Sequence, residues 1–201
     1  MMLVMDITDT TDTRIRILRE AAALFEQRGY AGTSMADLSE AVGITKSSLY
    51  HHFPSKEALL LEIVQITVDR VTPMIADIVA SDLAPAEKLE RAVTTHLIEG
   101  LRDRDNLACF LQEGRNLRPE HLEGYLAKRD RYERMFRDIL EEGIVAGDFR
   151  PLDVRLTAMA ILGMCNSSVR WYRPGGGYPP EAIAKSYADL AVRSVVSEEG
   201  R

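Results

Sequence analysis

The sequence predicts an all-α protein. Apolar residues recur at three- and four-residue spacing through most of the chain, and sustained alternation of apolar and polar residues is almost absent. Capping residues and glycine or proline breakers divide this pattern into about nine helical segments. With 201 residues, 46% of them hydrophobic, the chain is long enough for one or two domains with an apolar core.

Local signals define the first two helices. An apolar stripe predicts a helix from about residue 13 to residue 27, and Gly29 ends it. Ser34 and Asp37 then form a capping box, in which each side chain satisfies a free backbone N–H of the other residue. A short second helix therefore opens at Ser34.

A glycine turn joins the second helix to a third. Gly43 breaks the second helix, and Thr45 can cap the next one, at 46–52. Gly43 also lets the backbone take the left-handed turn that sets the crossing angle between the two helices. Val42 and Ile44 are apolar and fix that angle. The three helices together form a helix-turn-helix.

Longer helices are expected in the rest of the chain. One with a strong apolar stripe starts near Lys56, and Pro73 should bend or end it. Five more are predicted, at 86–103, 107–113, 119–146, 153–172 and 179–196. The domain boundary is expected within the helix that starts near Lys56, because a shared helix would couple both halves.

The overall charge argues against nucleic-acid binding, but the charge distribution does not. The net charge is −6, and residues 1–60 hold six Lys or Arg against eight Asp or Glu. Residues 41–56, by contrast, contain two lysines, two histidines and no acidic residue. A local basic face of this kind is enough to contact phosphates even on an acidic protein.

The third helix presents hydrogen-bonding side chains to the outside. Small polar residues near its N-terminus would let it lie close in a major groove, where N-terminal side chains meet base edges. Adjacent His51 and His52 point about 100° apart, so we do not expect them to share a metal ion and predict no metal site. The outward positions are Thr45, Lys46, Ser47, Ser48, Tyr50 and His51.

The run from Phe25 to Glu57, which ends in LYHHFPSKE, resembles the DNA-binding domain of the TetR family nearly position for position. The resemblance implies a TetR-like fold, with an N-terminal three-helix bundle that carries the helix-turn-helix at 1–57 and a C-terminal ligand-binding and dimerisation domain at 58–201. It also implies that Lys46, Ser47 and Ser48 face bases. Residues that match phosphate contacts of the family are Ser34, Thr45, Tyr50, His51 and Lys56, and the predicted DNA-binding set includes Thr33.

The same resemblance implies a transcriptional repressor that binds double-stranded operator DNA and is released by a small apolar ligand. The segment from Asn166 to Gly177 reads N-x3-RWYRP-GG and is similar to TetR-family repressors of fatty-acid and steroid-ring catabolism that respond to acyl-CoA. Arginines beside an apolar tunnel suit such a thioester, because its acyl part needs an apolar wall and its phosphates need guanidinium groups. Ser167 departs from the aromatic residue common in relatives, which leaves the acyl group open. Alternatively, the segment only shapes the turn between the last two helices.

Candidate effector contacts are aromatic and apolar side chains at helical spacing, which equally form plain core. A single histidine on such a face is likewise more often a satisfied core residue than a ligand contact. The predicted ligand-binding residues are His96, Leu97, Leu101, Phe110, Tyr125, Arg129, Tyr132, Phe136, Met164 and Arg170. We expect a small-molecule effector, which the resemblance implies is an acyl-CoA, and no resident cofactor.

The last two helices are expected to form a homodimer. Small residues would allow close helix approach, and Ile161, Val192 and Val195 would supply an apolar seam. The small residues are Ala158, Ala160, Gly163 and Ser167. Two-fold symmetry would then place two reading helices about one DNA turn apart, on a near-palindromic operator.

Two other functions stay open. A thiol redox sensor would use Cys109 and Cys165, although both lie in apolar surroundings, where thiols are usually inert. A helical interaction protein that does not bind DNA would show no salt-dependent DNA affinity. An enzyme is not expected, and we predict no catalytic residues, because the sequence lacks GxSxG, HExxH, P-loop and dinucleotide-binding glycine motifs.

The compartment is expected to be the cytoplasm. Residues 1–12 have neither a basic n-region nor a long apolar h-region, so no signal peptide is predicted. No stretch of eighteen uninterrupted apolar residues occurs, which argues against a membrane span. The two cysteines do not form a CxxC pair, and a reducing compartment fits them.

Overall fold

The computed structural model describes residues 7–197, and within that range the protein is helical, as predicted. The prediction of no signal peptide rests partly on residues 1–6, which lie outside the described residues. The β-type pairing within residues 7–197 consists of one isolated antiparallel bridge, between Phe149 and Val196. The helices are α1 Ile7–Arg28, α2 Met35–Val42, α3 Lys46–His52, α4 Lys56–Val79, α5 Pro85–Arg102, α6 Arg104–Glu113, α7 Pro119–Ala146, α8 Val154–Trp171 and α9 Pro180–Val195, with a 3-10 turn, η1, at Gly114–Asn116.

Helix α1 begins earlier than the sequence predicts, and α4 takes one of the two courses expected at Pro73. Helix α1 begins at Ile7, within a segment rich in Asp and Thr whose composition gives little helical signal. Helix α4 does not end at Pro73 but continues to Val79. Beyond the proline, Ile75 is fully buried and Ile78 packs on the same core, so burial of this last part offsets the backbone hydrogen bond that proline cannot make.

The described chain divides into two compact units. One, the N-terminal unit, contains the residues up to Thr67 together with Asp105–Tyr125. The other, the C-terminal unit, contains Val68–Arg104 together with the residues from Leu126 onward. The chain therefore passes between the units three times: within α4, at the first residue of α6, and within α7. The predicted division of function between 1–57 and 58–201 stays a prediction.

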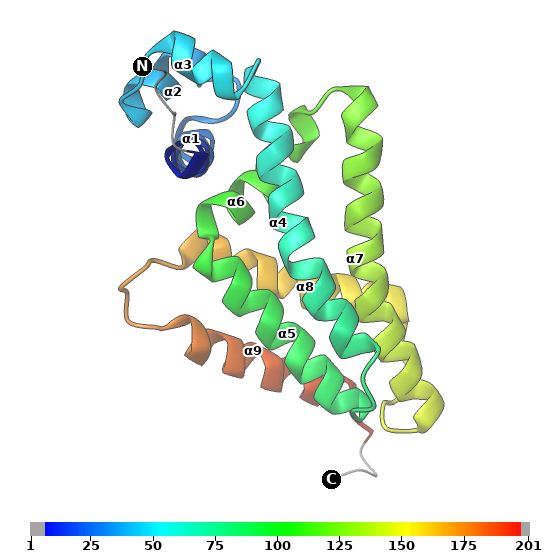
Figure 1. Ribbon diagram of the computed structural model, residues 1–201. Helices are drawn as coiled ribbons and strands as arrows, with labels where there is room; N and C mark the ends of the chain where they lie inside the picture. Colours follow the sequence, from blue (N-terminus) through cyan, green and yellow to red (C-terminus); the bar gives the residue numbers. More distant parts are fainter. Residues whose placement is uncertain (1–6, 198–201) are drawn as a thin grey trace. The chain divides into compact units, whose positions relative to one another are not determined.

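The N-terminal unit is built around the helix-turn-helix. Helix α1 packs on α2 and α2 on α3, and the three lie together at the blue and cyan end of the ribbon (Figure 1). Each contributes large side chains to one small core. The fully buried members are Ile17, Phe25, Leu38, Leu49 and Phe53, with Leu59 and Leu60 from α4. The packing of α1 on α2 and of α2 on α3, with the buried side chains of each, keeps α3 in a fixed orientation.

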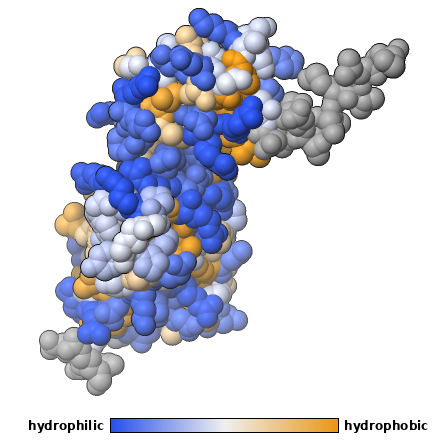
Figure 2. Space-filling view, turned by 90° about the vertical axis from the view of Figure 1, so that its left-hand side faces the viewer, coloured by the Kyte–Doolittle hydropathy of each residue, from blue (hydrophilic) through white to orange (hydrophobic). Residues whose placement is uncertain are grey.

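The C-terminal unit holds the larger core. Helices α5 and α9 run side by side, and α8 contacts both of them (Figure 1). The core includes Leu89, Val93, Phe136, Ile139 and Leu140, all at most 1% exposed. On the face shown in Figure 2 most of the surface is hydrophilic, and apolar residues show only in patches.

Gly143 on α7 leads to a first prediction. A Cβ at this position would collide with the ring of Phe149, whereas a Cβ at Gly124 on the same helix would meet nothing within 4 Å. We expect Gly143→Ala to lower the free energy of unfolding by about 1–3 kcal/mol, because overpacking outweighs the better helix propensity of alanine. Gly124→Ala should raise it by up to about 1 kcal/mol. Urea unfolding of both variants checks this, and a stabilised Gly143→Ala would contradict it.

Candidate nucleic-acid interface and effector core

Backbone caps fix the approach to the reading helix α3. The Ser34 Oγ accepts a hydrogen bond from the Asp37 N–H at 3.1 Å, and the Asp37 carboxylate accepts from the Ser34 N–H at 2.8 Å. The Ser34 hydroxyl also donates to the same carboxylate at 2.6 Å, and these bonds hold the pKa of Asp37 below its ordinary value. The predicted capping box is confirmed, and it already engages the Ser34 side chain.

The turn between α2 and α3 has the predicted left-handed glycine. Gly43 has φ 74° and ψ 34°, and its N–H donates to the carbonyl of Glu40 at 3.1 Å. The next N–H, of Ile44, donates to the carbonyl of Ser39 at 3.0 Å. Thr45 then caps α3, because its Oγ1 accepts from the Ser48 N–H at 3.1 Å. These local bonds set the crossing angle of the two helices.

The residues of α3 that were predicted to face outward are exposed or partly exposed. Tyr50 is 50% exposed, and Ser48 is half-buried. Lys46 makes no ion pair with the residues that the structure describes, so its charge is available to a phosphate or a base. The other exposed members of the face are Thr45, Ser47 and His51.

Two of the predicted DNA contacts also have partners inside the protein. The Lys56 ammonium donates to the carbonyls of Tyr30 at 2.6 Å and Thr33 at 2.7 Å, and it lies 4.3 Å from the centre of the Tyr30 ring. Thr33 is 1% exposed, and its hydroxyl donates to the carbonyl of Gly29 at 2.9 Å. The Lys56 side chain therefore holds the turn between α1 and α2 against the start of α4, and the Thr33 side chain stabilises that turn from within. The Lys56 ammonium keeps one further N–H donor for a phosphate, and the Lys56 backbone N–H in the first turn of α4 is another.

Arg14 helps to position the reading helix, a role that the sequence did not indicate. Its guanidinium donates to the carbonyl of His52, the last residue of α3, at 2.8 Å and pairs with Glu62 on α4. It also lies 4.1 Å from the centre of the Phe53 ring. Arg14 thus ties the C-terminus of the reading helix to α1 and α4. Burial, together with the charges of His51 and Arg14, lowers the pKa of His52, which favours its neutral form.

A chain of three polar side chains, centred on the buried His96, lies in the C-terminal unit. His96 on α5 lies 2.8 Å through Nδ1 from the Tyr132 hydroxyl on α7, and 3.1 Å through Nε2 from Oδ1 of Asn166 on α8. Burial lowers the pKa of His96 to about 4, so the ring is neutral at physiological pH. Because Oδ1 only accepts, the Nε2–H donates to it and the Tyr132 hydroxyl donates to Nδ1. His96 therefore joins three helices by hydrogen bonds alone.

The remaining predicted effector contacts fall in both units. Leu97, Leu101 and Phe136 are core residues of the C-terminal unit, and Met164 packs on that core. Phe110 and Tyr125 belong to the N-terminal unit, where the Tyr125 hydroxyl donates to the Phe110 carbonyl at 3.1 Å. Arg129 and Arg170 are exposed. A cavity of about 520 Å³ in the C-terminal unit is lined by Met74, Ile78 and Thr94 among others and contains none of the predicted contacts.

The two cysteines lie in different units, and both are buried. Burial raises the pKa of Cys109 and of Cys165 to about 12, so neither carries thiolate at neutral pH. No cluster of three or more side chains suited to a metal ion occurs among residues 7–197. No helix in that part of the chain is long and apolar enough to cross a membrane.

The predicted dimer seam lies only in part on the surface of α8 and α9. Ile161 and Val195 are 4% and 0% exposed, because they pack in the core of their own unit, and Ala158 is buried with them. The opposite faces carry exposed apolar side chains: Leu156 at 63%, Met159 at 49% and Leu190 at 51%. Ala160 and Gly163 are also exposed on α8. The apolar surface available to a partner is therefore this outer set.

Comparisons with known proteins cover both parts of the chain. Residues 17–63 match the family described as bacterial regulatory proteins, tetR family, and residues 82–195 match the tetracyclin repressor-like C-terminal domain. The chain is 32% identical over 194 residues to the HTH-type transcriptional repressor KstR2 of Rhodococcus jostii (strain RHA1), with 96% of this chain and 95% of that protein covered.

Solved structures agree with these matches. The ketosteroid transcriptional regulator KstR2 of Mycobacterium tuberculosis superposes with a TM-score of 0.86 at 31% identity, covering 92% of this chain and 95% of the other. AibR in complex with isovaleryl coenzyme A and operator DNA gives a TM-score of 0.78 at 28% identity, covering 89% and 97%.

Proposed function

Because this chain belongs to the TetR family of bacterial regulatory proteins, we propose that it is a transcriptional repressor whose hold on operator DNA is weakened by a CoA thioester. The resemblance predicted from the sequence is thereby confirmed at the level of the family. The exposed face of α3 carries the DNA-binding part of the proposal. A seven-residue helix with Lys46, Tyr50 and His51 turned outward is shaped to enter a groove rather than to fill a core.

The proposal includes a homodimer formed through the outer faces of α8 and α9. Leu156, Met159 and Leu190 supply apolar area there, and Gly163 allows close approach of a second helix. A two-fold axis through this contact would present two copies of α3 to one duplex. The operator is then a near-palindrome with half-sites about one turn of DNA apart.

The nature of the effector is proposed from two observations. AibR, a structural relative, has a crystal structure in complex with isovaleryl coenzyme A and operator DNA. In this chain Arg170 and Arg173 are exposed around the end of α8, where guanidinium groups can bind the phosphates of CoA. The core near His96 and Tyr132 would receive the acyl part. The predicted set, from Leu97 and Leu101 to Met164, stays the candidate lining.

Release requires that the effector bind one conformation better than another. The effector candidates of the C-terminal unit are covalently joined to the DNA-reading unit within α4, at the start of α6 and within α7. Movement of these helices on effector binding would change the spacing of the two reading helices. The chain would therefore act by binding and not by catalysis, as the regulators it resembles do.

A selection followed by a titration tests the proposal. The protein selects a duplex from a randomised library, and isovaleryl-CoA, a long-chain acyl-CoA and free CoA are titrated into the complex. We expect an acyl-CoA, but not free CoA, to weaken binding at least about fivefold, and Tyr50→Phe to weaken it without any ligand. If no duplex is selected, the DNA-binding function is wrong. If a duplex is selected and no thioester releases it, the effector class is wrong.

The salt dependence of DNA affinity gives a further prediction. Lys46→Ala removes one available cation from each reading helix, so the slope of log Kd against log salt concentration should fall by about 2 for the dimer. Arg134→Ala, an exposed change on α7, is the control and should leave the slope unchanged. Fluorescence anisotropy over a salt series measures both. An unchanged slope for Lys46→Ala would place that side chain away from the duplex.

A thiol redox sensor is the second candidate, and burial of both thiols weighs against it. Loss of DNA binding on mild peroxide treatment that Cys109→Ser or Cys165→Ser prevents would favour it over the CoA effector.

A further inference from the structure

The first turn of α4 is held from two sides by neighbouring residues of opposite charge. Helix α3 ends at His52 and α4 begins at Lys56, so only three residues join them, and one of these, Phe53, is 1% exposed. Lys56 is bound by the carbonyls that precede α2, as described above. The position of this turn therefore sets the orientation of the reading helix.

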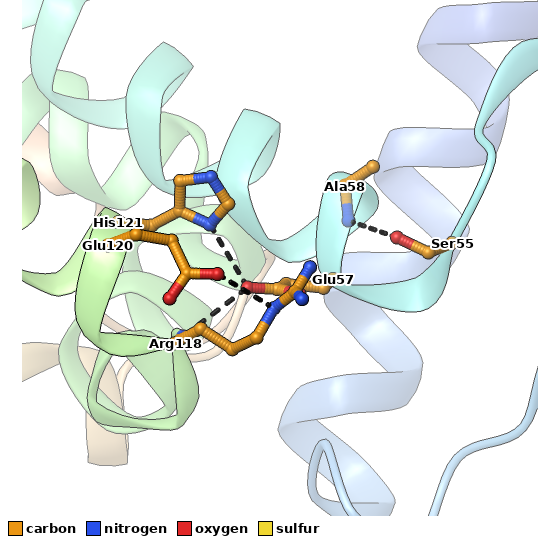
Figure 3. A network of polar contacts seen from close by, with 6 residues as sticks. All are labelled: Ser55, Glu57, Ala58, Arg118, Glu120 and His121. Atoms are coloured by element: carbon orange, nitrogen blue, oxygen red, sulfur yellow. Dashed lines mark hydrogen bonds and ion pairs between the residues drawn. The ribbon is translucent and has the colours of Figure 1, made fainter.

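Glu57 holds the other side of the turn. Its carboxylate accepts hydrogen bonds from the His121 Nδ1 at 3.0 Å and from the Arg118 backbone N–H at 3.3 Å, and it forms an ion pair with the Arg118 guanidinium (Figure 3). The Glu57 side chain is only 12% exposed, while the Arg118 side chain is 63% exposed. Figure 3 shows Arg118 and His121 converging on this one carboxylate from the start of α7.

The carboxylate is held in its charged form. Burial alone would raise the pKa of Glu57, but the hydrogen bonds from His121 and Arg118 outweigh it and lower that pKa. A charged carboxylate with little exposure is tolerated only while its partners stay in place. The network therefore favours one position of the first turn of α4 over slightly displaced positions of the same turn.

These partners come from a distant part of the sequence. Arg118 and His121 follow Glu57 by 61 and 64 residues and belong to Asp105–Tyr125, the segment that joins the helix-turn-helix in one compact unit. Gly29, at the end of α1, also lies near Glu113 of this segment. The segment is therefore packed into the same unit as the reading helix, although the sequence places it in the effector half.

Resting on the DNA-binding function proposed above, we propose that Glu57 is a positioning residue for operator recognition. Through Arg118 and His121 it sets the angle at which α4 receives α3, so the DNA-reading unit includes Asp105–Tyr125. Glu57 itself need not touch DNA. Its negative charge would repel phosphates, so a direct effect of removing it would be stronger binding to any duplex.

The test compares specific with non-specific affinity. The probes are the duplex selected by the wild-type protein and a scrambled duplex of the same composition. We expect Glu57→Ala, Arg118→Ala and His121→Ala each to bind the selected duplex about five- to tenfold more weakly than the wild type. Only Arg118→Ala should also bind the scrambled duplex more weakly, because it removes a cation. The triple variant should bind the selected duplex no more weakly than Arg118→Ala, since the three residues act as one unit.

Glu120→Gln is the matched control. Glu120 lies in the first turn of α7, beside His121, and is exposed. Its carboxylate lies 3.5 Å from the Arg118 Nε. Glu120→Gln should leave the ratio of the two affinities unchanged, because the loss of one negative charge affects both duplexes alike. Thermal unfolding of each variant checks the fold, and the exposed Arg118→Ala carries the test if Glu57→Ala does not fold.

Equal affinity of Glu57→Ala and the wild type for the selected duplex would overturn this role while leaving the repressor function intact. Stronger binding of Glu57→Ala to both duplexes would also overturn it. A wild-type protein that selects no duplex overturns both the role and the function beneath it.

Discussion

Leu190→Arg is expected to produce monomers and to weaken operator binding roughly a thousandfold or more. Leu190 is 51% exposed on α9, so the substitution places a charge on the outer face without disturbing the core of its own unit. In a dimer the same position would be buried, and two guanidinium groups would face each other near the symmetry axis. Each monomer would then meet only one half-site, which removes roughly half of the binding free energy.

Leu126→Arg is the matched control for this experiment. Leu126 is also an exposed leucine, at 44%, but it lies on α7 and outside the proposed contact. It should remain a dimer and keep its affinity for the selected duplex. Sedimentation velocity gives the mass of each variant, and anisotropy gives the affinity. A dimeric Leu190→Arg with full DNA binding would show that α9 does not form the interface.

The helix-turn-helix could be predicted because its signals are local. Ser34 with Asp37, Gly43 and Thr45 each satisfy or release backbone groups within four residues, so their roles are visible in the sequence. The internal roles of Lys56 and Thr33 were not visible in this way. The partners of Lys56 depend on how α4 closes against the turn that precedes α2, which is a tertiary contact, whereas Thr33 bonds the carbonyl of Gly29 only four residues away and its burial follows from that packing.

The dimer face could not be assigned because α8 has two apolar stripes. Ala158, Ile161 and Cys165 face the core, while Leu156 and Met159 face outward. Both sets recur at helical spacing, and only the packing of α5 and α9 decides which of them is buried. The joining of Asp105–Tyr125 to the helix-turn-helix is hidden for a similar reason, since it depends on ion pairs between residues far apart in sequence.

The second large effect is expected from the buried histidine under acid. In the folded state the pKa of His96 is about 4 because burial disfavours its charged form, compared with an ordinary value of 6.5. Between these two values the unfolded chain binds a proton that the folded chain does not. The stabilising contribution is therefore complete above about pH 6.5 and is lost as the pH falls to about 4, by about 3 kcal/mol in total.

His96→Gln isolates this contribution, because glutamine can still donate and accept hydrogen bonds but does not titrate. The variant should be less stable than the wild type at neutral pH, since it will not reproduce both the 2.8 Å contact with Tyr132 and the 3.1 Å contact with Asn166. Between about pH 7 and about pH 4, however, it should lose about 3 kcal/mol less of its free energy of unfolding than the wild type. Acidic side chains that titrate near pH 4 are common to both proteins and cancel in the comparison. Urea unfolding at several pH values measures the difference, and parallel pH profiles would mean that His96 reaches solvent protons as easily in the folded chain as in the unfolded one.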